Sequence, residues 1–156
     1  MSMLERFRAP KKLELRDKDA GDTPLRDDKK GKLKNGEIKE RERALTVELT
    51  GEIAKLQEKL YAAREQKLLL ILQGMDTSGK DGTIRALFSQ INPMGLHATG
   101  FVAPTDKEKA HDFLWRVHAR VPGKGEIGIF NRSHYEDVLV PRISGALDDD
   151  ACARRY

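Results

Sequence analysis

The sequence has little of what secreted, disulfide-stabilised or membrane-spanning proteins need. Its 156 residues include one cysteine, Cys152, which cannot form an internal disulfide and which fits a reducing compartment. The longest apolar run, Leu68 to Leu72, is far too short to span a bilayer. The amino terminus, MSMLERFRAP, carries charges where a signal peptide needs an apolar core. We therefore expect a cytoplasmic protein with no membrane partner.

Aromatic residues are also scarce, and the basic excess is confined to one end of the chain. Residues 1–43 hold 14 Lys/Arg against 10 Asp/Glu, whereas residues 44–156 hold 15 of each. No basic stretch alternates with aromatic side chains that could stack on bases, so we expect no nucleic-acid partner. The basic end could attract an anionic polymer. On composition alone we favour a solvated arm.

Periodicity divides the chain into two parts. Residues 1–36 are predicted to be a basic, irregular arm, because Pro and Gly are scattered among many charges. Residues 37–156 are predicted to be the folded core. An amphipathic helix is expected over 37–66, with its apolar stripe facing the core. The stripe consists of Leu45, Leu49, Ile53, Leu56, Leu60 and Ala63.

The core pattern alternates strands and helices. Residues 67–73 contain the apolar run Leu68 to Leu72, which predicts a central strand buried on both faces. Thr105 and Glu108 have the spacing of a capping box at the start of a helix. The other expected elements are a helix over 81–91, a strand over 98–102, a helix over 105–120 and a strand over 126–130. This order predicts an α/β fold, a doubly wound parallel sheet flanked by helices.

A glycine-rich loop follows the first strand and opens the next helix. Gly74 to Lys80 matches G-x-x-x-x-G-K, the Walker A spacing. Glycines let the backbone N–H groups turn inward toward phosphate oxygens, and the lysine reaches the outer phosphates. The alternative reading is a surface turn. The predicted phosphate-binding residues are Gly74, Thr77, Ser78, Gly79, Lys80, Asp81, Gly82 and Thr83.

Two aspartates distinguish this loop from that of ordinary P-loop enzymes. Asp81 stands where those enzymes place a Ser or Thr on Mg²⁺. Asp76 lies inside the loop, where a carboxylate repels phosphate unless it binds a metal or takes a proton. We predict that Asp76 binds Mg²⁺ or orients the attacking phosphate. The alternative is an aspartate that caps its own turn.

A second polar cluster follows the third strand, at the edge where open α/β sheets bind ligands. Arg132 is placed there to clamp phosphate, and Glu136 or Asp137 to bind metal. Judged from the residue types alone, two adjacent carboxylates more often mark a solvated helix start. The candidate catalytic residues are therefore Asp76, Lys80 and Arg132.

The stretches GMDTSGKDGTI and PTDKEKAHDFLWRVHARVPGKGEIGIFNRSHYEDVLVPRI resemble the polyphosphate kinase 2 family, and the likeness runs from about residue 12 to 147. HDFLWR and NRSHYEDVLV are similar to the subgroup that acts on AMP as well as ADP. The resemblance implies a P-loop kinase fold close to thymidylate kinase. It also implies reversible, Mg²⁺-dependent phosphoryl transfer between inorganic polyphosphate and AMP, ADP or ATP, and a homo-oligomer in the full-length protein.

The resemblance also assigns residues. Gly74, Asp76, Gly79 and Lys80 match its Walker A positions, and Arg132 matches the arginine of its second motif. Other members have aspartate where this chain has Asn131. Glu136 and Asp137 are then the candidates to replace that carboxylate.

The family continues past the second motif with a helical lid and further strands, so the resemblance implies a fold incomplete at its C-terminal end. Two alternatives to a polyphosphate-dependent kinase stay open. One is an ATP-dependent P-loop nucleoside monophosphate kinase. The other is a non-catalytic polyphosphate-binding fragment.

Overall fold

The computed structural model describes residues 5, 7–14, 16–21 and 35–155. They belong to two compact units, residues 1–40 and 41–156. The first unit contains the 3₁₀ helix η1 (Asp17–Gly21) and the start of α2 (Asn35–Ala63). Residues 1–4, 6, 15 and 22–34 of the expected arm lie outside the described residues, so the irregular arm stays a prediction. In the described part of the chain, no helix has the length and apolarity to cross a membrane.

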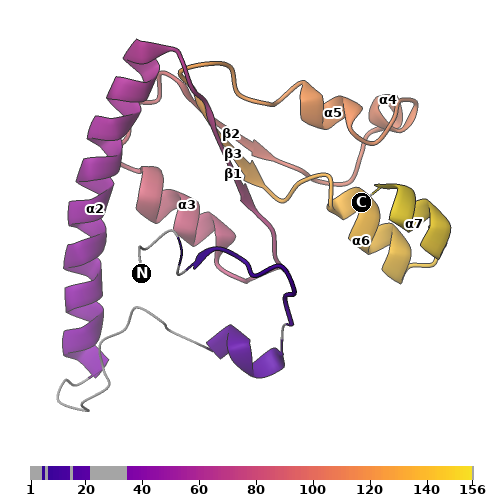
Figure 1. Cartoon of the computed structure of the whole chain (residues 1–156), viewed down its shortest axis with the longest axis horizontal. Coiled ribbons are helices and arrows are strands. Elements are labelled where there is room, and N and C mark those ends of the chain that lie inside the picture. The colour runs from indigo at the N-terminus through magenta and orange to yellow at the C-terminus, as the bar shows by residue number, and fades with distance from the viewer. Residues whose placement is uncertain (1–4, 6, 15, 22–34, 156) are drawn as a thin grey trace. The chain divides into compact units, whose positions relative to one another are not determined.

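The second unit is built on a parallel sheet. Its strands lie in the order β1-β3-β2, and both pairings are parallel. The part of α2 in this unit and α3 lie on one side of the sheet, and α4 and α5 lie on the other (Figure 1). The predicted parallel sheet flanked by helices is confirmed. After α2, the elements are β1 (Leu68–Leu72), α3 (Lys80–Phe88), β2 (Leu96–Gly100), α4 (Asp106–Lys109), α5 (Trp115–His118), β3 (Ile127–Asn131), α6 (Glu136–Ile143) and α7 (Asp149–Arg155).

The centre of the sheet is β3, and the expectation that β1 is the central buried strand is wrong. Ile129 and Phe130 are each 1% exposed, whereas Leu68 is 52% and Ile71 38% exposed. The two strands have similar apolar sequences, so composition could not rank them. Burial depends on neighbours, and β3 has a strand on each side, whereas the described residues give β1 one strand neighbour.

Helix α2 packs with only part of its predicted apolar stripe, because Ile53 and Leu60 are half-buried but three leucines are exposed. Leu45, Leu49 and Leu56 are 52%, 46% and 62% exposed, while Gln57 is 2% exposed. The Gln57 Nε2 atom donates to the carbonyl of Met94 at 2.9 Å. This hydrogen bond to the turn before β2 pairs the donor of a polar side chain on the packed face, as burial of a polar group requires.

The helix expected over 105–120 is two short helices. Its start is as predicted, because Thr105 and Glu108 form a capping box, with the Thr105 N–H donating to Glu108 Oε2 at 2.7 Å. The break follows α4. There the Asp112 carboxylate accepts the N–H of Leu114 at 2.9 Å. A short acidic side chain that binds nearby backbone in this way competes with continued helix.

Candidate phosphate-binding site

The Walker loop joins the carboxyl end of β1 to the amino end of α3. Gly79 has φ +90°, a left-handed conformation that glycine adopts without steric cost and that lets the chain enter α3. The N–H of Thr83 then donates to the Gly79 carbonyl at 2.9 Å, which closes the first turn of the helix. The earlier N–H groups of such a turn have no partner within the helix and attract anions.

Lys80 lies back over its own loop. Its Nζ atom donates to the carbonyls of Gly74 at 2.8 Å and Met75 at 2.6 Å. These carbonyls fix the ammonium group at the base of the loop. From there it can offset the charge of phosphate oxygens placed above the backbone N–H groups.

A cavity of about 450 Å³ lies above this loop. Its walls come from three places in the sequence: the loop and first turn of α3 from Asp76 to Gly82, the segment 100–103 at the end of β2, and the residues Asn131 and Arg132 at the end of β3. The structure therefore brings most of the predicted phosphate-binding residues and Arg132 to one space. Gly74 and Thr83 are exceptions, since they line a neighbouring cavity on the β1 side.

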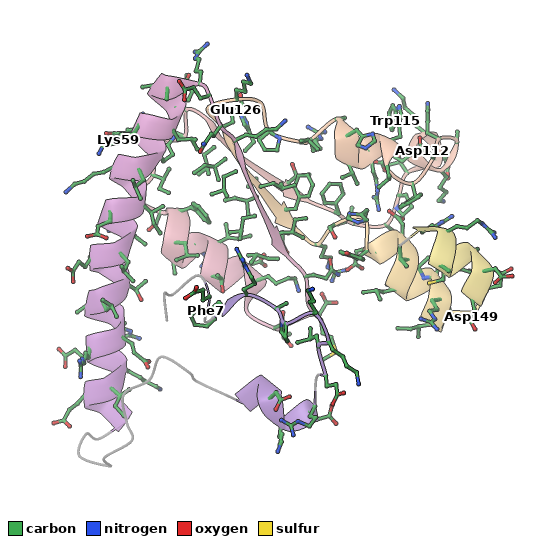
Figure 2. The ribbon with its side chains drawn as sticks, viewed as in Figure 1. Phe7, Lys59, Asp112, Trp115, Glu126 and Asp149 are labelled. Carbon is green, nitrogen blue, oxygen red and sulfur yellow. The ribbon has the colours of Figure 1, made fainter. Side chains whose placement is uncertain are left out.

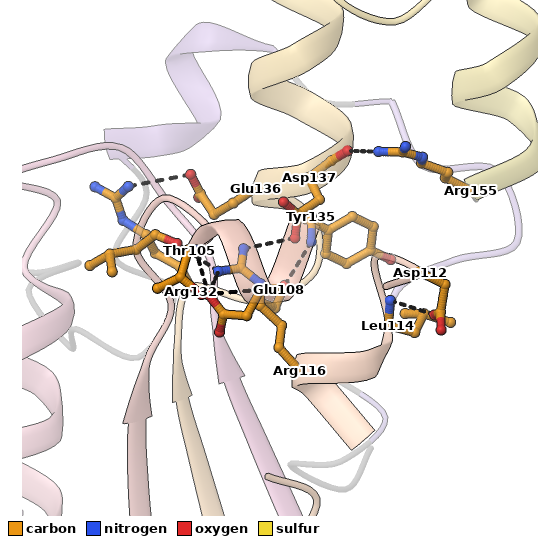
Figure 3. Close-up of polar contacts among 12 residues, drawn as sticks. Thr105, Glu108, Asp112, Leu114, Arg116, Arg132, Tyr135, Glu136, Asp137 and Arg155 are labelled. Atoms are coloured by element: carbon orange, nitrogen blue, oxygen red, sulfur yellow. Dashed lines mark hydrogen bonds and ion pairs between the residues drawn. The ribbon is translucent and has the colours of Figure 1, made fainter. Parts of the chain in front are cut away.

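Arg132 points into the cavity from a strained backbone. Its φ of 67° lies in the left-handed region, which arginine seldom adopts and which marks functional sites. The guanidinium pairs with Asp76 and with Glu136, the latter at 3.3 Å (Figure 3). The hydrogen bond to Asp76, followed by the charge of Glu136, raises the pKa of Arg132, which keeps it positive.

Asp76 and Asp81 are two carboxylates on the wall of the same cavity. Asp81 accepts a hydrogen bond from the amide of Asn131. In the described part of the chain, no group of three or more His, Cys, Asp or Glu could hold a metal. Mg²⁺ often takes only one or two protein carboxylates and completes its shell with water and substrate phosphates, so this pair fits it. Asp81 was predicted from the sequence as a phosphate-binding residue but not as a metal-binding one.

Glu136 and Asp137 are adjacent in the sequence but point to different places. Glu136 contacts Arg132 and accepts from the Gln73 amide at 2.7 Å, so it belongs beside the cavity. Asp137 instead pairs with Arg116 at 2.8 Å and lines another cavity. Sequence reasoning missed Gln73 and Arg116. The signals were the position of Gln73 next to the Walker loop and that of Arg116 inside HDFLWR.

Comparison with known proteins gives consistent matches. The sequence model of the family described as Polyphosphate kinase 2 (PPK2) matches residues 36–156. An AMP/ADP-polyphosphate phosphotransferase from Meiothermus ruber is 52% identical over 113 residues, which are 72% of this chain and 42% of that protein. An ADP-polyphosphate phosphotransferase from Rhodopseudomonas palustris is 48% identical over 91 residues, 58% of this chain and 32% of that protein.

Solved structures agree with the sequence matches. Polyphosphate Kinase 2 from Arthrobacter aurescens TC1 superposes with a TM-score of 0.81 at 39% identity, over 97% of this chain and 52% of that one. A putative polyphosphate kinase 2 from Pseudomonas aeruginosa gives a TM-score of 0.67 at 30% identity, over 81% of this chain and 27% of that one. The chain thus spans about half or less of the length of these relatives.

Proposed function

The chain belongs to the polyphosphate kinase 2 family, and from that premise we propose that the protein transfers phosphoryl groups between inorganic polyphosphate and adenine nucleotides. The observation that carries the proposal is the shared cavity, in which the Walker loop and Arg132 meet from distant parts of the chain. The printed names of the relatives, AMP/ADP- and ADP-polyphosphate phosphotransferase, supply the substrate class.

The reaction is a displacement at the terminal phosphorus of polyphosphate. A β-phosphate oxygen of ADP attacks that phosphorus, and the bond to the penultimate phosphate's bridging oxygen breaks. The products are ATP and a polyphosphate chain shorter by one phosphate. With AMP the attacking oxygen belongs to the α-phosphate and the product is ADP. The same steps run backward in the reverse reaction.

Each functional side chain in the cavity has a separate role. The loop N–H groups at the start of α3 hold phosphate oxygens, and the Lys80 ammonium offsets their charge. The Arg132 guanidinium leaves Asp76 to bind the transferred group, for which its planar fork of donors is suited. Positioning and charge stabilisation of this kind account for most of the catalysis in phosphoryl transfer.

Asp76 and Asp81, which line the same cavity, would hold Mg²⁺, which neutralises developing charge on phosphate oxygens when it is bound. Glu136 is proposed to hold Arg132 in place rather than to bind the metal directly, because its carboxylate already contacts Arg132 and Gln73. Asp137 is not included, because its carboxylate contacts Arg116 on the far side of the turn.

Phosphorus NMR tests the proposal directly. The chain is incubated with ADP, long-chain polyphosphate and Mg²⁺, and ATP signals are followed in time. The Lys80→Ala variant removes the loop cation, and Lys59→Ala is the matched control because Lys59 lies on α2, away from the cavity (Figure 2). We expect ATP from the parent and from Lys59→Ala, and a loss of at least about 100-fold in Lys80→Ala.

Two results would overturn the proposal. Product from ATP and AMP but none from polyphosphate would indicate an ATP-dependent nucleoside monophosphate kinase. Binding of polyphosphate by a folded sample, with no product in either direction, would indicate a binding module. Unfolding curves of all three proteins are measured alongside, so that a folding defect is not taken for a catalytic one.

A further inference from the structure

Among the described residues, Arg116 is the only charged one that the structure buries. It lies on α5 and is 7% exposed. Its Nη2 atom donates to Asp137 at 2.8 Å, and its Nη1 atom donates to the carbonyl of Val102 at 2.7 Å. The guanidinium carbon also lies 5.5 Å from the centre of the ring of Phe101, which belongs to the small core cluster. The side chain therefore has fixed partners on several sides.

One partner of Arg116 lies in a wall of the phosphate cavity, and the other lies on the helix that follows the Arg132 turn. Val102 is part of the segment after β2 that lines the cavity. Asp137 is the second residue of α6, the helix that begins where the Arg132 turn ends. A second arginine, Arg155 on α7, donates to the Asp137 carbonyl at 2.7 Å. The Arg116 guanidinium thus joins the segment after β2 to α6, the helix that follows the Arg132 turn.

The turn that this connection holds contains Arg132. The left-handed backbone at Arg132 persists only where surrounding contacts impose it. At its start, the Arg132 N–H donates to the carbonyl of Leu72 at 2.9 Å. In its middle, the Ser133 hydroxyl donates to Gln73 at 3.1 Å. At its end, the contact between Asp137 and Arg116 anchors the turn to α5.

We propose that Arg116 is a positioning residue for phosphate recognition: by bridging the Val102 carbonyl and Asp137, it holds Arg132 in the conformation that faces the cavity. Arg116 touches no phosphate itself. Lysine cannot replace it, because a single ammonium on a flexible stem does not reproduce the planar fork that spans both partners. The experiments that measure phosphate binding rest on the proposed function.

The test is a double-mutant cycle on tripolyphosphate binding, measured by calorimetry with Mg²⁺ on the full chain. Arg116→Lys keeps a positive charge near Asp137 and so protects the fold. Arg120→Lys makes the same change one turn later, on a side chain that lines a different cavity. We expect Arg132→Ala to weaken binding about tenfold, Arg116→Lys to weaken it about fivefold, and Arg120→Lys to leave it unchanged.

The double variant separates positioning from a general structural role. If Arg116 acts through Arg132, adding Arg116→Lys to Arg132→Ala weakens binding by less than about twofold further. Multiplied effects of the two substitutions would overturn the inference. So would unaltered binding in Arg116→Lys, provided that urea unfolding shows the variant to be folded.

A second readout does not depend on phosphate binding. The Nε–Hε NMR signal of Arg132, assigned by its loss in Arg132→Lys, reports the surroundings of the guanidinium without any ligand. We expect it to shift in Arg116→Lys and to stay in place in Arg120→Lys. If no protein binds tripolyphosphate, the proposed function fails, and this signal alone decides the inference: an unshifted signal overturns it.

Discussion

Two arginine–aspartate pairs flank the loop after β3, and they differ in exposure and in their other contacts. In the pair at the cavity, Arg132 is 30% and Asp76 83% exposed by side chain. In the pair beneath it, Arg116 is 7% and Asp137 14% exposed. Separating an exposed ion pair costs little free energy, whereas breaking a buried pair leaves an unpaired charge in the protein interior. The first pair can therefore open for a ligand, and the second holds the walls in place.

The difference in exposure matches the different roles that we propose for the two pairs, ligand binding for one and positioning for the other. Under the proposed function, Asp76 would bind a metal and Arg132 a phosphate group, and in the structure their charges pair with one another. Arg116 and Asp137 have the same charges but line a different cavity from the one above the Walker loop. Substitutions in the two pairs should therefore have different effects, and we expect the largest at the buried pair.

Replacing Arg116 by methionine should cause the largest loss of stability. The substitution leaves the Asp137 carboxylate buried without its partner, which typically costs about 3–5 kcal/mol. Urea unfolding followed by the fluorescence of Trp115, the single tryptophan, measures it. Adding Asp137→Leu should recover much of the loss, because the unpaired charge is removed as well. A loss below 1 kcal/mol would show that this pair is as dispensable as a surface pair.

Replacing Asp76 by asparagine should change binding and leave stability nearly unchanged. Without Mg²⁺, we expect tripolyphosphate to bind about fivefold more tightly, because a like charge about 4 Å away in water costs about 1 kcal/mol. With Mg²⁺, the gain in affinity that the metal gives the parent chain should be lost. Calorimetry with and without the metal measures both effects. Asp106→Asn on α4 is the control, and full retention of the Mg²⁺ effect in Asp76→Asn would remove Asp76 from the metal site.

The capping box at Thr105 and Glu108 should make stability depend on pH. The Thr105 backbone N–H, followed by its hydroxyl, lowers the pKa of Glu108 below the unfolded value of 4.5. A lowered folded pKa means that the unfolded chain binds the proton more tightly. The contribution is therefore complete above pH 4.5 and is lost as the pH falls through the folded pKa. Glu108→Gln should flatten this part of the stability curve, measured by urea unfolding from pH 7 to about pH 3.

The smallest effect is expected from the exposed pair on α4. Lys109 and Asp106 lie 3.1 Å apart, with side chains 60% and 100% exposed. Solvent screening leaves such pairs with little influence on folding. Lys109→Gln should thus have the urea midpoint of the parent chain. A clear decrease would show that exposure is a poor guide to the importance of ion pairs in this protein.

The sequence was sufficient to predict features that depend on local order. The Walker loop from Gly74 to Lys80 is recognisable because spacing and glycine conformation are properties of a short segment. The capping box at Thr105 is predictable for the same reason. The alternation of strands and helices gave the fold class, because a parallel sheet requires crossovers.

Features that depend on tertiary contacts could not be predicted in this way. Glu136 and Asp137 looked equivalent, and only the position of Arg116 on another helix separates them. The apolar residues of β1 suggested the centre of the sheet, but strand order is set by pairing partners. The apolar stripe of α2 was only partly a guide to the packed face, because Leu45, Leu49 and Leu56 are exposed while Gln57, bonded to Met94, is buried.

The central claim is that the exposed pair opens to receive phosphate while the buried pair stays closed. NMR spectra of the arginine Nε–Hε groups, recorded while Mg²⁺ and tripolyphosphate are added to the full chain, test it most directly. We predict that the Arg132 signal shifts and saturates with the ligand, while the Arg116 signal keeps its position. Saturable binding that leaves the Arg132 signal unmoved would place the phosphate elsewhere and contradict the account.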